Sequence, residues 1–526
     1  MASLAITLLC ISSGRAVGHG HLDQRQQQSV NLDRRMIEPS KQQQPRSNGN
    51  FRFLNDITKP YFVESLPDVP FDLGELYSGL VPIDKGNKSK SLFFVFQPTV
   101  GQPVDEITIE VNGGPGASSL EGFFQETGRF IWQPGTYAPV VNMYSWVNLT
   151  NMIWVDQPVG TGFSTGTPTA TTQEETAEDF IKFFKNFQQM FGIKRFKIYI
   201  AGQSYAGRYV PYISAAMLDQ KDTEYYDLRG ALAYNPVIGQ FDYVQQQVPA
   251  VPFMQRNANI FNLNASFMED LESLHESCGY EDFIEDYLTF PPSEVQPRRL
   301  FNSTGDAHCN VFGMIQTAAQ RLNPCFSIYD VTQKCPLLWD VLGYSTDLKY
   351  QPKGATIYFD RDDVKKAMHA PNQTWSLGSL VPVYVGGTSG PEEFGDLSAN
   401  PIEHVLPQVI EATNRVLISH GDYDMALITN GTLLAIQNMT WHGQLGFHSA
   451  PSTPIELDLP DFQNAEVYER NGLSSWKNGQ GIVGIQHYER GLMWAETFQA
   501  GHMQTFYQPR VAYRHLQWLL GRIESL

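Results

Sequence analysis

The chain has few charged residues and no cluster of basic ones. Charged residues make up 17% of the 526 residues and hydrophobic residues 42%, which is typical of a globular protein rather than a disordered one. Acidic residues outnumber basic ones by 55 to 37, which gives a net charge of −18. An acidic chain without a lysine- or arginine-rich segment is a poor partner for a phosphate backbone, so we expect no nucleic-acid ligand.

Long apolar runs are also missing after the N-terminus, so we expect no membrane span. Residues 2–11 resemble the apolar core of a short signal peptide, and residues 16–18 suit a cleavage site, although no basic segment precedes the core. We therefore predict a signal peptide at 1–18. The expected destination is the cell exterior or a vacuolar, lysosome-like compartment.

Residues 19–50 are rich in Gln, Arg, Asn and Ser and have no hydrophobic periodicity, which predicts a flexible leader or propeptide. Its pair Arg34-Arg35 is either a processing site or a chance pair. From residue 51 to 526 the pattern is that of one globular domain. Seven N-x-S/T sequons favour a glycosylated secretory protein: Asn87, Asn148, Asn264, Asn302, Asn372, Asn430 and Asn438.

Cysteine is scarce as well: beyond Cys10 the chain has only Cys278, Cys309, Cys325 and Cys335. In an oxidising compartment an even number predicts two disulfides, with free buried thiols as the alternative. Of the three possible pairings we predict the nested one, Cys278–Cys335 and Cys309–Cys325, because it closes the longer loop and constrains the unfolded chain more. CxxC and HxxxH pairs are missing, so we expect no metal site.

Strand-like and helix-like segments alternate along most of the domain. Strands are predicted at 92–96, 106–111, 152–156, 196–201, 356–359 and 415–419. A capping box from Thr172 to Glu175 begins a helix whose buried face carries Phe180, Phe183, Phe184 and Phe187. Further helices are expected at 362–368 and from Pro509 to Gly521. This alternation predicts an α/β protein with a mostly parallel sheet.

Residues from about 237 to 345 interrupt this alternation. They contain the four cysteines and acidic, helix-like stretches such as residues 266–274. We interpret them as a helical insertion that covers the active site and is stapled by disulfides.

The turn Gly202-Gln-Ser-Tyr-Ala-Gly207 directly follows the strand-like run 196–201. A tight corner between a strand and a helix lifts a serine hydroxyl clear of the sheet, as in the pattern G-x-S-x-G, although position 206 is Ala here. Such turns also arise by chance. The chain order Ser204, Asp424, His502 is nevertheless that of the α/β-hydrolases, which predicts acyl hydrolysis by a serine nucleophile.

A glycine-rich segment, Asn112-Gly-Gly-Pro-Gly116, follows a predicted strand. Acyl transfer needs N–H donors aimed at the oxyanion that develops in the transition state. We predict that the N–H groups of Tyr205 and Gly114 are these donors. The alternative is a glycine-rich turn without a catalytic role.

Five ordered motifs make a family resemblance specific: residues 112–119 (NGGPGASS), 154–164 (WVDQPVGTGFS), 202–207 (GQSYAG), 421–424 (GDYD) and 501–503 (GHM). From about residue 51 to the C-terminus the chain resembles the serine carboxypeptidase family, its fungal secreted members in particular. The resemblance implies an α/β-hydrolase fold with a helical insertion. It also implies release of C-terminal residues from peptides and proteins, usually at acid pH, without a metal or cofactor.

By motif position, the resemblance makes Ser204 the nucleophile, His502 the general base and then acid, and Asp424 the residue that orients His502. It also implies a site for the substrate's terminal carboxylate. That site would consist of Asn112, the N–H of Gly113, Glu126 and the residue at position 203. Met503 would line the leaving-residue pocket, or belong to the core.

Three positions depart from the family pattern. Gln203 replaces a Glu, Ala117 replaces a Cys whose partner is also missing, and Arg129 replaces a Pro. Because a Gln amide donates hydrogen bonds at every pH, we expect the Michaelis constant to depend less steeply on pH than in a two-Glu relative.

Other functions on the same scaffold are an acyltransferase and a non-catalytic binding protein. A plain lipase or esterase would leave Asn112 and Glu126 without a role. A homodimer is compatible with the sequence.

Overall fold

The structure is a computed structural model. It describes residues 51–526 except 300, 302–304, 344–349, 388–394, 458, 460, 462–466, 468–469 and 473–480. The predicted signal peptide, the predicted leader and Asn302 therefore lie outside the described residues. The described residues belong to one compact unit. Within the described ranges, no helix is both long and apolar enough to cross a membrane.

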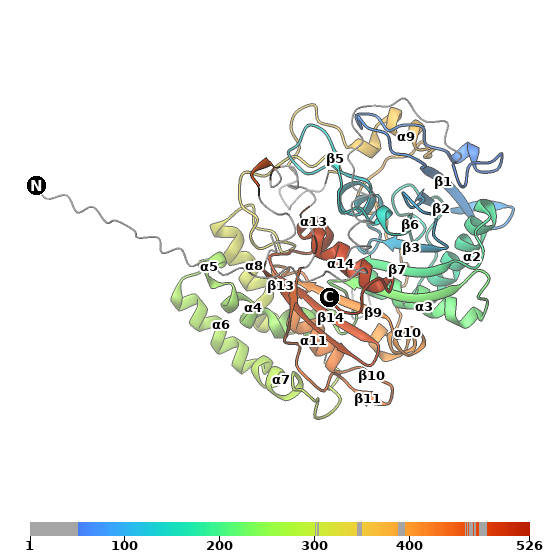
Figure 1. The fold of residues 1–526 in the computed structure, drawn as a ribbon. Helices are drawn as coiled ribbons and strands as arrows, with labels where there is room; N and C mark the ends of the chain where they lie inside the picture. Colours follow the sequence, from blue (N-terminus) through green and yellow to red (C-terminus); the bar gives the residue numbers. More distant parts are fainter. Residues whose placement is uncertain are drawn as a thin grey trace, which may run out of the picture. The chain divides into compact units, whose positions relative to one another are not determined.

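Ten strands of the described chain form one sheet, in the order β1-β2-β6-β3-β7-β8-β9-β14-β13-β12 (Figure 1). They are β1 (Tyr77–Asp84), β2 (Asn87–Gln97), β3 (Glu106–Val111), β6 (Asn151–Asp156), β7 (Lys197–Gln203), β8 (Asp227–Tyr234), β9 (Val416–Gly421), β12 (Thr453–Glu456), β13 (Ile482–Glu489) and β14 (Leu492–Thr497). The strands from β6 to β14 in this order are parallel, and the flanking pairs are antiparallel. The prediction of a mostly parallel sheet is confirmed.

Alternate residues of the central strands enter two separate hydrophobic cores. Ile198 and Ile200 of β7 face one core, whereas Tyr199 and Ala201 face the other. This period of two, with both faces apolar, is the sequence signature of a parallel sheet covered on both sides.

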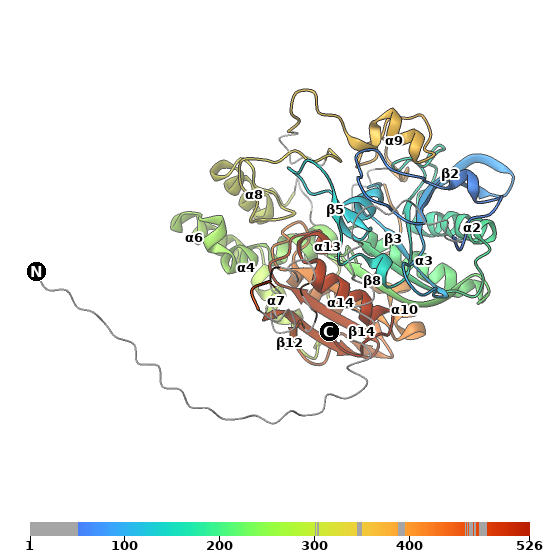
Figure 2. The same ribbon diagram turned by 45° about the horizontal axis from the view of Figure 1, so that its top comes forward.

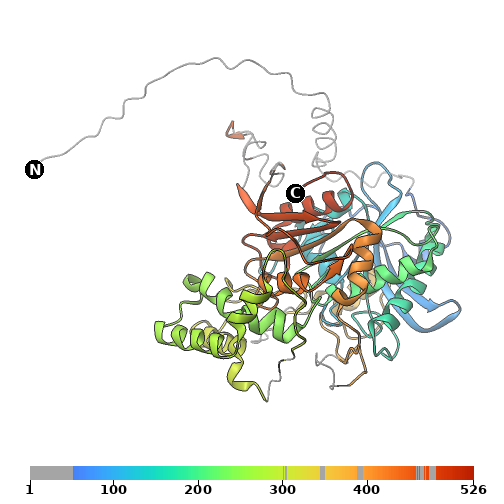
Figure 3. The same cartoon turned by 90° about the horizontal axis from the view of Figure 1, so that it is seen from below.

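Helices cover both faces of the sheet. The helices α2 (Gln173–Phe191), α3 (Ala206–Gln220) and α10 (Val405–Thr413) contribute to one core, and α14 (Pro509–Leu519) contributes to the other. Figure 3 shows the sheet between the red helix α14 and the helices of the opposite face. The predicted cap of α2 is present, because the Thr172 side chain accepts a hydrogen bond from the N–H of Glu175.

A helical segment between β8 and β9 has its own hydrophobic core (green to yellow in Figures 1 and 2). It consists of a π-helical turn (Phe241–Gln247), α4 (Val248–Arg256), α5 (Ala258–Phe261), α6 (Ala265–Ser277), α7 (Tyr280–Tyr287) and α8 (Val311–Leu322). The predicted helix at 266–274 lies within α6. Smaller elements are α9 (Asp362–Ala367), α11 (Thr429–Gln437), α13 (Gln504–Tyr507) and two short hairpins, β4 (Phe130–Ile131) with β5 (Val140–Val141) and β10 (Thr440–Trp441) with β11 (Gln444–Leu445).

Two disulfides are present, but the predicted pairing is wrong: the bonds are Cys278–Cys309 and Cys325–Cys335. Cys278 ends α6, and Cys309 lies in the turn before α8, where the Tyr280 hydroxyl donates to its carbonyl (2.9 Å). The prediction rested on the entropy of the unfolded chain. Pairing is instead decided by which cysteines the packed helices bring close enough for their sulfur atoms to bond.

The predicted strand at 356–359 is also wrong. Residues Tyr358–Asp360 form a 3₁₀ turn, and the rings of Tyr358 and Phe359 pack on Phe124, with centroids 4.6 and 4.9 Å away. β-branched and aromatic residues favour a strand only when a neighbouring strand is available. Here the aromatic cluster takes its place.

Candidate active site

Ser204 occupies the sharp corner between β7 and α3. Its φ of +65° is a left-handed conformation that few residues other than glycine adopt. The corner is held through the backbone of Ser204, whose N–H donates to the Tyr234 carbonyl (2.9 Å) and whose carbonyl accepts from Gly207 (2.9 Å). A Cβ at Gly207 would lie 2.5 Å from Pro236. This close approach explains why the turn needs small residues.

Asp424 and His502 form a short hydrogen bond, 2.7 Å between Oδ2 and Nδ1. The second oxygen of Asp424 accepts from the N–H groups of Ala426 (2.9 Å) and Leu427 (3.3 Å), which fixes the carboxylate in place. Burial raises the pKa of Asp424, while His502 and these N–H groups act in the opposite direction. Asp422, two residues earlier, accepts instead from the N–H of Ala500 (3.3 Å).

The end of β8 joins the serine corner to the histidine loop. Tyr234 accepts the N–H of Ser204, and the next residue, Asn235, donates from its side chain to the carbonyl of His502 (2.5 Å). Asn235 also accepts from the N–H of Gly421 on the aspartate loop (2.8 Å). Through these two residues the three predicted catalytic groups share one edge of the sheet.

The glycine-rich loop packs directly on the serine corner. A Cβ at Gly113 would lie 2.5 Å from the Tyr205 nitrogen and 2.6 Å from the Gln203 carbonyl oxygen, so only glycine fits. Gly114 has a φ of +106°. The two predicted oxyanion donors, Tyr205 and Gly114, therefore belong to segments in direct contact.

The helical segment between β8 and β9 reaches the histidine. The Tyr329 ring lies 5.1 Å from the His502 ring, and the Tyr329 carbonyl accepts the N–H of His502 (2.7 Å). Met503, predicted to line the leaving-residue pocket, is half-buried immediately before α13.

A buried ion pair braces the other side of the serine corner. Arg208 of α3 and Asp396 are fully buried and 2.9 Å apart, and the Tyr205 hydroxyl also donates to Asp396 (2.6 Å). Burial alone would raise the pKa of Asp396, but Arg208 and hydrogen bonds from Ser398, Tyr205 and Gln173 lower it overall. This network connects the side chain of Tyr205, whose N–H is a predicted oxyanion donor, to the loop at 396–400.

Three of the four predicted carboxylate-binding residues, all except Gly113, line one small cavity, which has room for about one water molecule. Its lining includes Asn112, Glu126 and Gln203, together with Glu110 and Thr505. Gln203 points toward Glu126 and donates to it (Nε2 to Oε1, 3.0 Å). Glu126 ends a π-helical turn, Gly122–Glu126, that follows the glycine-rich loop.

Two buried carboxyl groups, Glu110 and Glu126, line this cavity, and a third, Glu121, accepts a hydrogen bond from Asn112. Burial raises the pKa of Glu126 to about 7, although Gln203 and His502 lower it. Burial, reinforced by Glu126, raises the pKa of Glu110 to about 8. For Glu121 burial again raises the pKa well above its usual range, and Glu126 and Asp340 add to the effect. These groups therefore carry protons at the acid pH expected for the family.

Stability should fall as pH rises from 6.5 to 8. The folded chain keeps protons on Glu110 and Glu126 that the unfolded chain has lost near pH 4.5, so their stabilisation disappears as pH passes 7 and 8. Three buried histidines oppose this trend, because burial lowers their folded pKa to about 3 or 4 while the unfolded chain still releases their protons around pH 6.5: His275, His420 and His515. Glu121, whose pKa burial also raises, adds to the loss. On balance we expect the free energy of unfolding, measured in urea, to drop by about 2 kcal/mol between pH 6.5 and 8.

The Glu110→Gln variant is the matched control. It removes the carboxyl group whose pKa is the higher of the two, Glu110 and Glu126. Its stability should fall less over the same pH interval. Equal stability of the wild type at pH 6.5 and 8 would show that these carboxyls do not hold protons.

Backbone contacts hold the loop at Ala117, where the family pattern has a disulfide. The N–H of Ser118 donates to Leu377 (2.8 Å), and the N–H of Ser379 donates to Gly116 (2.8 Å). Arg129 donates to the Leu73 carbonyl (3.2 Å).

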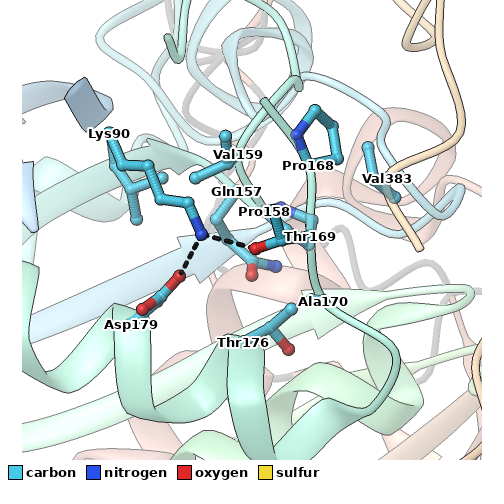
Figure 4. Close-up of a pocket in the computed structure, with 11 residues that line it drawn as sticks. Lys90, Gln157, Pro158, Val159, Pro168, Thr169, Ala170, Thr176, Asp179 and Val383 are labelled. Carbon is cyan, nitrogen blue, oxygen red and sulfur yellow. Dashed lines mark hydrogen bonds and ion pairs between the residues drawn. The ribbon is translucent and has the colours of Figure 1, made fainter. Parts of the chain in front are cut away.

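A second small crevice lies between β2, α2 and the loop before α2 (Figure 4). The Lys90 ammonium group donates to the Thr169 hydroxyl (2.6 Å) and lies 4.0 Å from Asp179. None of the predicted site residues is among the eleven residues that line this crevice. We therefore place the candidate active site at the serine corner.

Sequence reasoning missed Glu110, Glu121, Asn235 and Asp396. For Glu110 the local pattern was misleading, because Glu106–Val111 alternates polar and apolar residues, which is typical of a strand with one face in solvent. Glu121 did offer a signal, because it lies in an apolar stretch between Leu120 and Phe123. Asn235 and Asp396 carry no such signal.

Comparison with known proteins identifies the family. Residues 67–522 match the family described as serine carboxypeptidase. The chain is 64% identical to serine-type carboxypeptidase F of Aspergillus niger over 525 residues, covering 100% of this chain and 98% of the relative. It is 42% identical to a probable serine carboxypeptidase of Arthroderma benhamiae, covering 97% of this chain and 95% of the relative.

Among solved structures, the prohormone-processing carboxypeptidase Kex1(delta)p of Saccharomyces cerevisiae has a similar fold. Its TM-score is 0.65 at 21% identity, with 88% of this chain and 96% of that chain covered. The predicted fold class is confirmed. The chain belongs to the serine carboxypeptidase family, as a serine-type carboxypeptidase that hydrolyses peptides.

Proposed function

We propose that the chain releases single C-terminal residues from peptides and proteins at acid pH, through an acyl-enzyme on Ser204. The observation that carries this proposal is the position of the carboxylate pocket. Gln203, which lines the pocket, directly precedes Ser204, and Glu126 in the same pocket is close enough to His502 for the two to interact electrostatically. A terminal carboxylate held there leaves the last peptide bond at the serine.

In the proposed mechanism, His502 takes the Ser204 proton as the hydroxyl attacks the scissile carbonyl. Asp424 keeps the imidazole in the required tautomer through the bond to Nδ1. The N–H groups of Tyr205 and Gly114 stabilise the oxyanion. His502 then protonates the leaving amine, and water hydrolyses the acyl-enzyme.

The acid preference follows from the carboxylate pocket. Asn112, the N–H of Gly113 and the Gln203 amide donate to the substrate carboxylate, and Glu126 donates only while it is protonated. The ionised form of Glu126 would repel the substrate anion. Because the Glu126 pKa is raised to about 7, binding should weaken as pH approaches and passes neutrality.

Digestion of a peptide library across pH, with mass spectrometry of the products, tests this function. We expect ladders shortened by one residue at a time from the C-terminus, and we expect peptides with a C-terminal amide to be cleaved more slowly. Internal cleavage, or transfer of the acyl group to an added acceptor in place of water, would overturn the proposal.

The Gln203→Glu variant tests the role of this residue in pH dependence. A second carboxyl beside Glu126 adds a titrating group, so we expect the KM for peptides to rise more steeply between about pH 5 and 7 than in the wild type. At pH 4 to 5, where both carboxyls are protonated, KM and kcat should remain close to the wild-type values. Identical KM profiles would remove Gln203 from carboxylate recognition.

We also propose that the chain is an N-glycosylated secretory protein, released outside the cell or delivered to a vacuolar compartment. Of the predicted acceptors, Asn87, Asn264 and Asn372 are exposed, whereas Asn148, Asn430 and Asn438 are partly buried. N-terminal sequencing of the mature protein tests the predicted cleavage near residue 18 and removal of residues 19–50. Light scattering tests the possible homodimer.

A further inference from the structure

Asn112 is held by a carboxyl group to which the family resemblance assigns no role. Its side-chain amide donates to Glu121 (Nδ2 to Oε2, 2.7 Å), and its backbone N–H donates to the Ser119 hydroxyl (3.0 Å). An Asn amide nitrogen has two hydrogens. With one of them bound to Glu121, the amide has a defined orientation and the second hydrogen remains for a ligand.

Glu121 is buried behind Asn112 in the hydrogen-bond network and does not itself line the pocket. It is 5% exposed, and its second oxygen, Oε1, is buried without a hydrogen-bond partner. A carboxylate in this position would be costly to bury without such a partner. A protonated carboxyl needs fewer partners, because its charge is absent.

The groups that act on Glu121 come from several elements. Glu110 lies on β3, Glu126 at the end of the same π-helical turn, and Asp340 on the loop before residue 343. Tyr507 of α13 is also within electrostatic reach. Most of these groups are acids, so ionisation of one carboxyl disfavours ionisation of the next.

We propose that Glu121 is a positioning residue for the substrate carboxylate: it orients the Asn112 amide and, with Glu126, forms the pair of titrating carboxyls at this site. The inference rests on the proposed function. Because Gln203 replaces a Glu, Glu126 alone was expected to titrate at this site. With Glu121 included, the site has two titrating carboxyls. Glu121 acts on the substrate through Asn112, whereas the Glu of the family pattern acts from the position before the nucleophile.

Two substrates separate carboxylate recognition from chemistry. One is an N-blocked dipeptide with a free terminal carboxylate, and the other is an ethyl ester of an N-blocked amino acid, which has none. We expect Glu121→Ala at pH 5 to raise KM for the dipeptide by about tenfold, because a misoriented Asn112 amide loses its charge-assisted hydrogen bond to the substrate carboxylate. KM for the ester and kcat for both substrates should change less than about twofold.

The conservative variant Glu121→Gln provides the second readout. Its side-chain oxygen still accepts from Asn112, so the dipeptide KM at pH 5 should stay within about twofold of the wild type. As pH rises beyond the acid range, KM should rise less than in the wild type, because one ionisable group is gone. If Glu121→Ala does not fold, the dependence of KM on pH in Glu121→Gln still tests the proposal.

Asp340→Asn is the matched control. Asp340 belongs to the same carboxyl cluster but accepts from Gln125 (2.8 Å) rather than from Asn112, so its substitution should leave the dipeptide KM at pH 5 unchanged. The inference is overturned if Glu121→Ala raises KM equally for the dipeptide and the ester, or if the Glu121→Gln profile matches the wild type. A wild type that cleaves the ester but not the dipeptide would instead refute the proposed function.

Discussion

Replacing Ser204 by alanine is expected to lower kcat for peptide hydrolysis on the order of 10⁶-fold, the loss that follows removal of the nucleophile from such a triad. The variant should fold normally. The hydrogen bonds that hold the corner come from the backbone of Ser204, and Ala has the same Cβ at the strained φ of +65°. Steady-state kinetics with a peptide substrate, together with circular dichroism, measures both outcomes.

Labelling provides an independent check on this serine. An organophosphonate should modify the wild type once, at Ser204, and should not modify Ser204→Ala. If the variant kept more than about one hundredth of the activity, another residue would have to be the nucleophile.

Replacing Asp424 by asparagine should lower kcat by roughly 10⁴-fold. The Asn amide nitrogen would donate toward Nδ1 and stabilise the wrong tautomer of His502. The fold should be kept, because the Asn oxygen can still accept from the N–H groups of Ala426 and Leu427 as Asp424 does. The measurement is kcat across pH, with the thermal midpoint as a check on folding.

Asp422→Asn is the control for this variant. Asp422 accepts from the N–H of Ala500 rather than from His502, so the activity loss should be far smaller. A greater loss in Asp422→Asn than in Asp424→Asn would show that the wrong aspartate has been assigned to the triad.

Local patterns predict the sheet and the serine corner well. Parallel strands are buried on both faces, so a run such as residues 196–201 is recognisable from its composition alone. The corner after it requires small residues at fixed offsets, and Gly202 and Gly207 supply them. Each of these features depends on residues that are neighbours in the sequence.

Features that depend on packing between distant segments could not be predicted in the same way. The disulfide pairing depends on how α6 and α8 pack, and the strand predicted at 356–359 gave way to an aromatic cluster around Phe124. Glu121 illustrates a different limit. Its presence in an apolar stretch is visible in the sequence, but its bond to Asn112 depends on how the loop folds back.

The order of the three proposed catalytic residues along the chain has a consequence for biosynthesis. The serine corner, the helical segment and the aspartate loop are all made before β14, the strand that pairs with β9 and leads to His502 near the C-terminus. A growing or truncated chain that ends before residue 502 therefore lacks the proposed general base. Peptide-bond cleavage becomes possible only after almost the whole polypeptide has been synthesised, so unfinished chains cannot digest their neighbours.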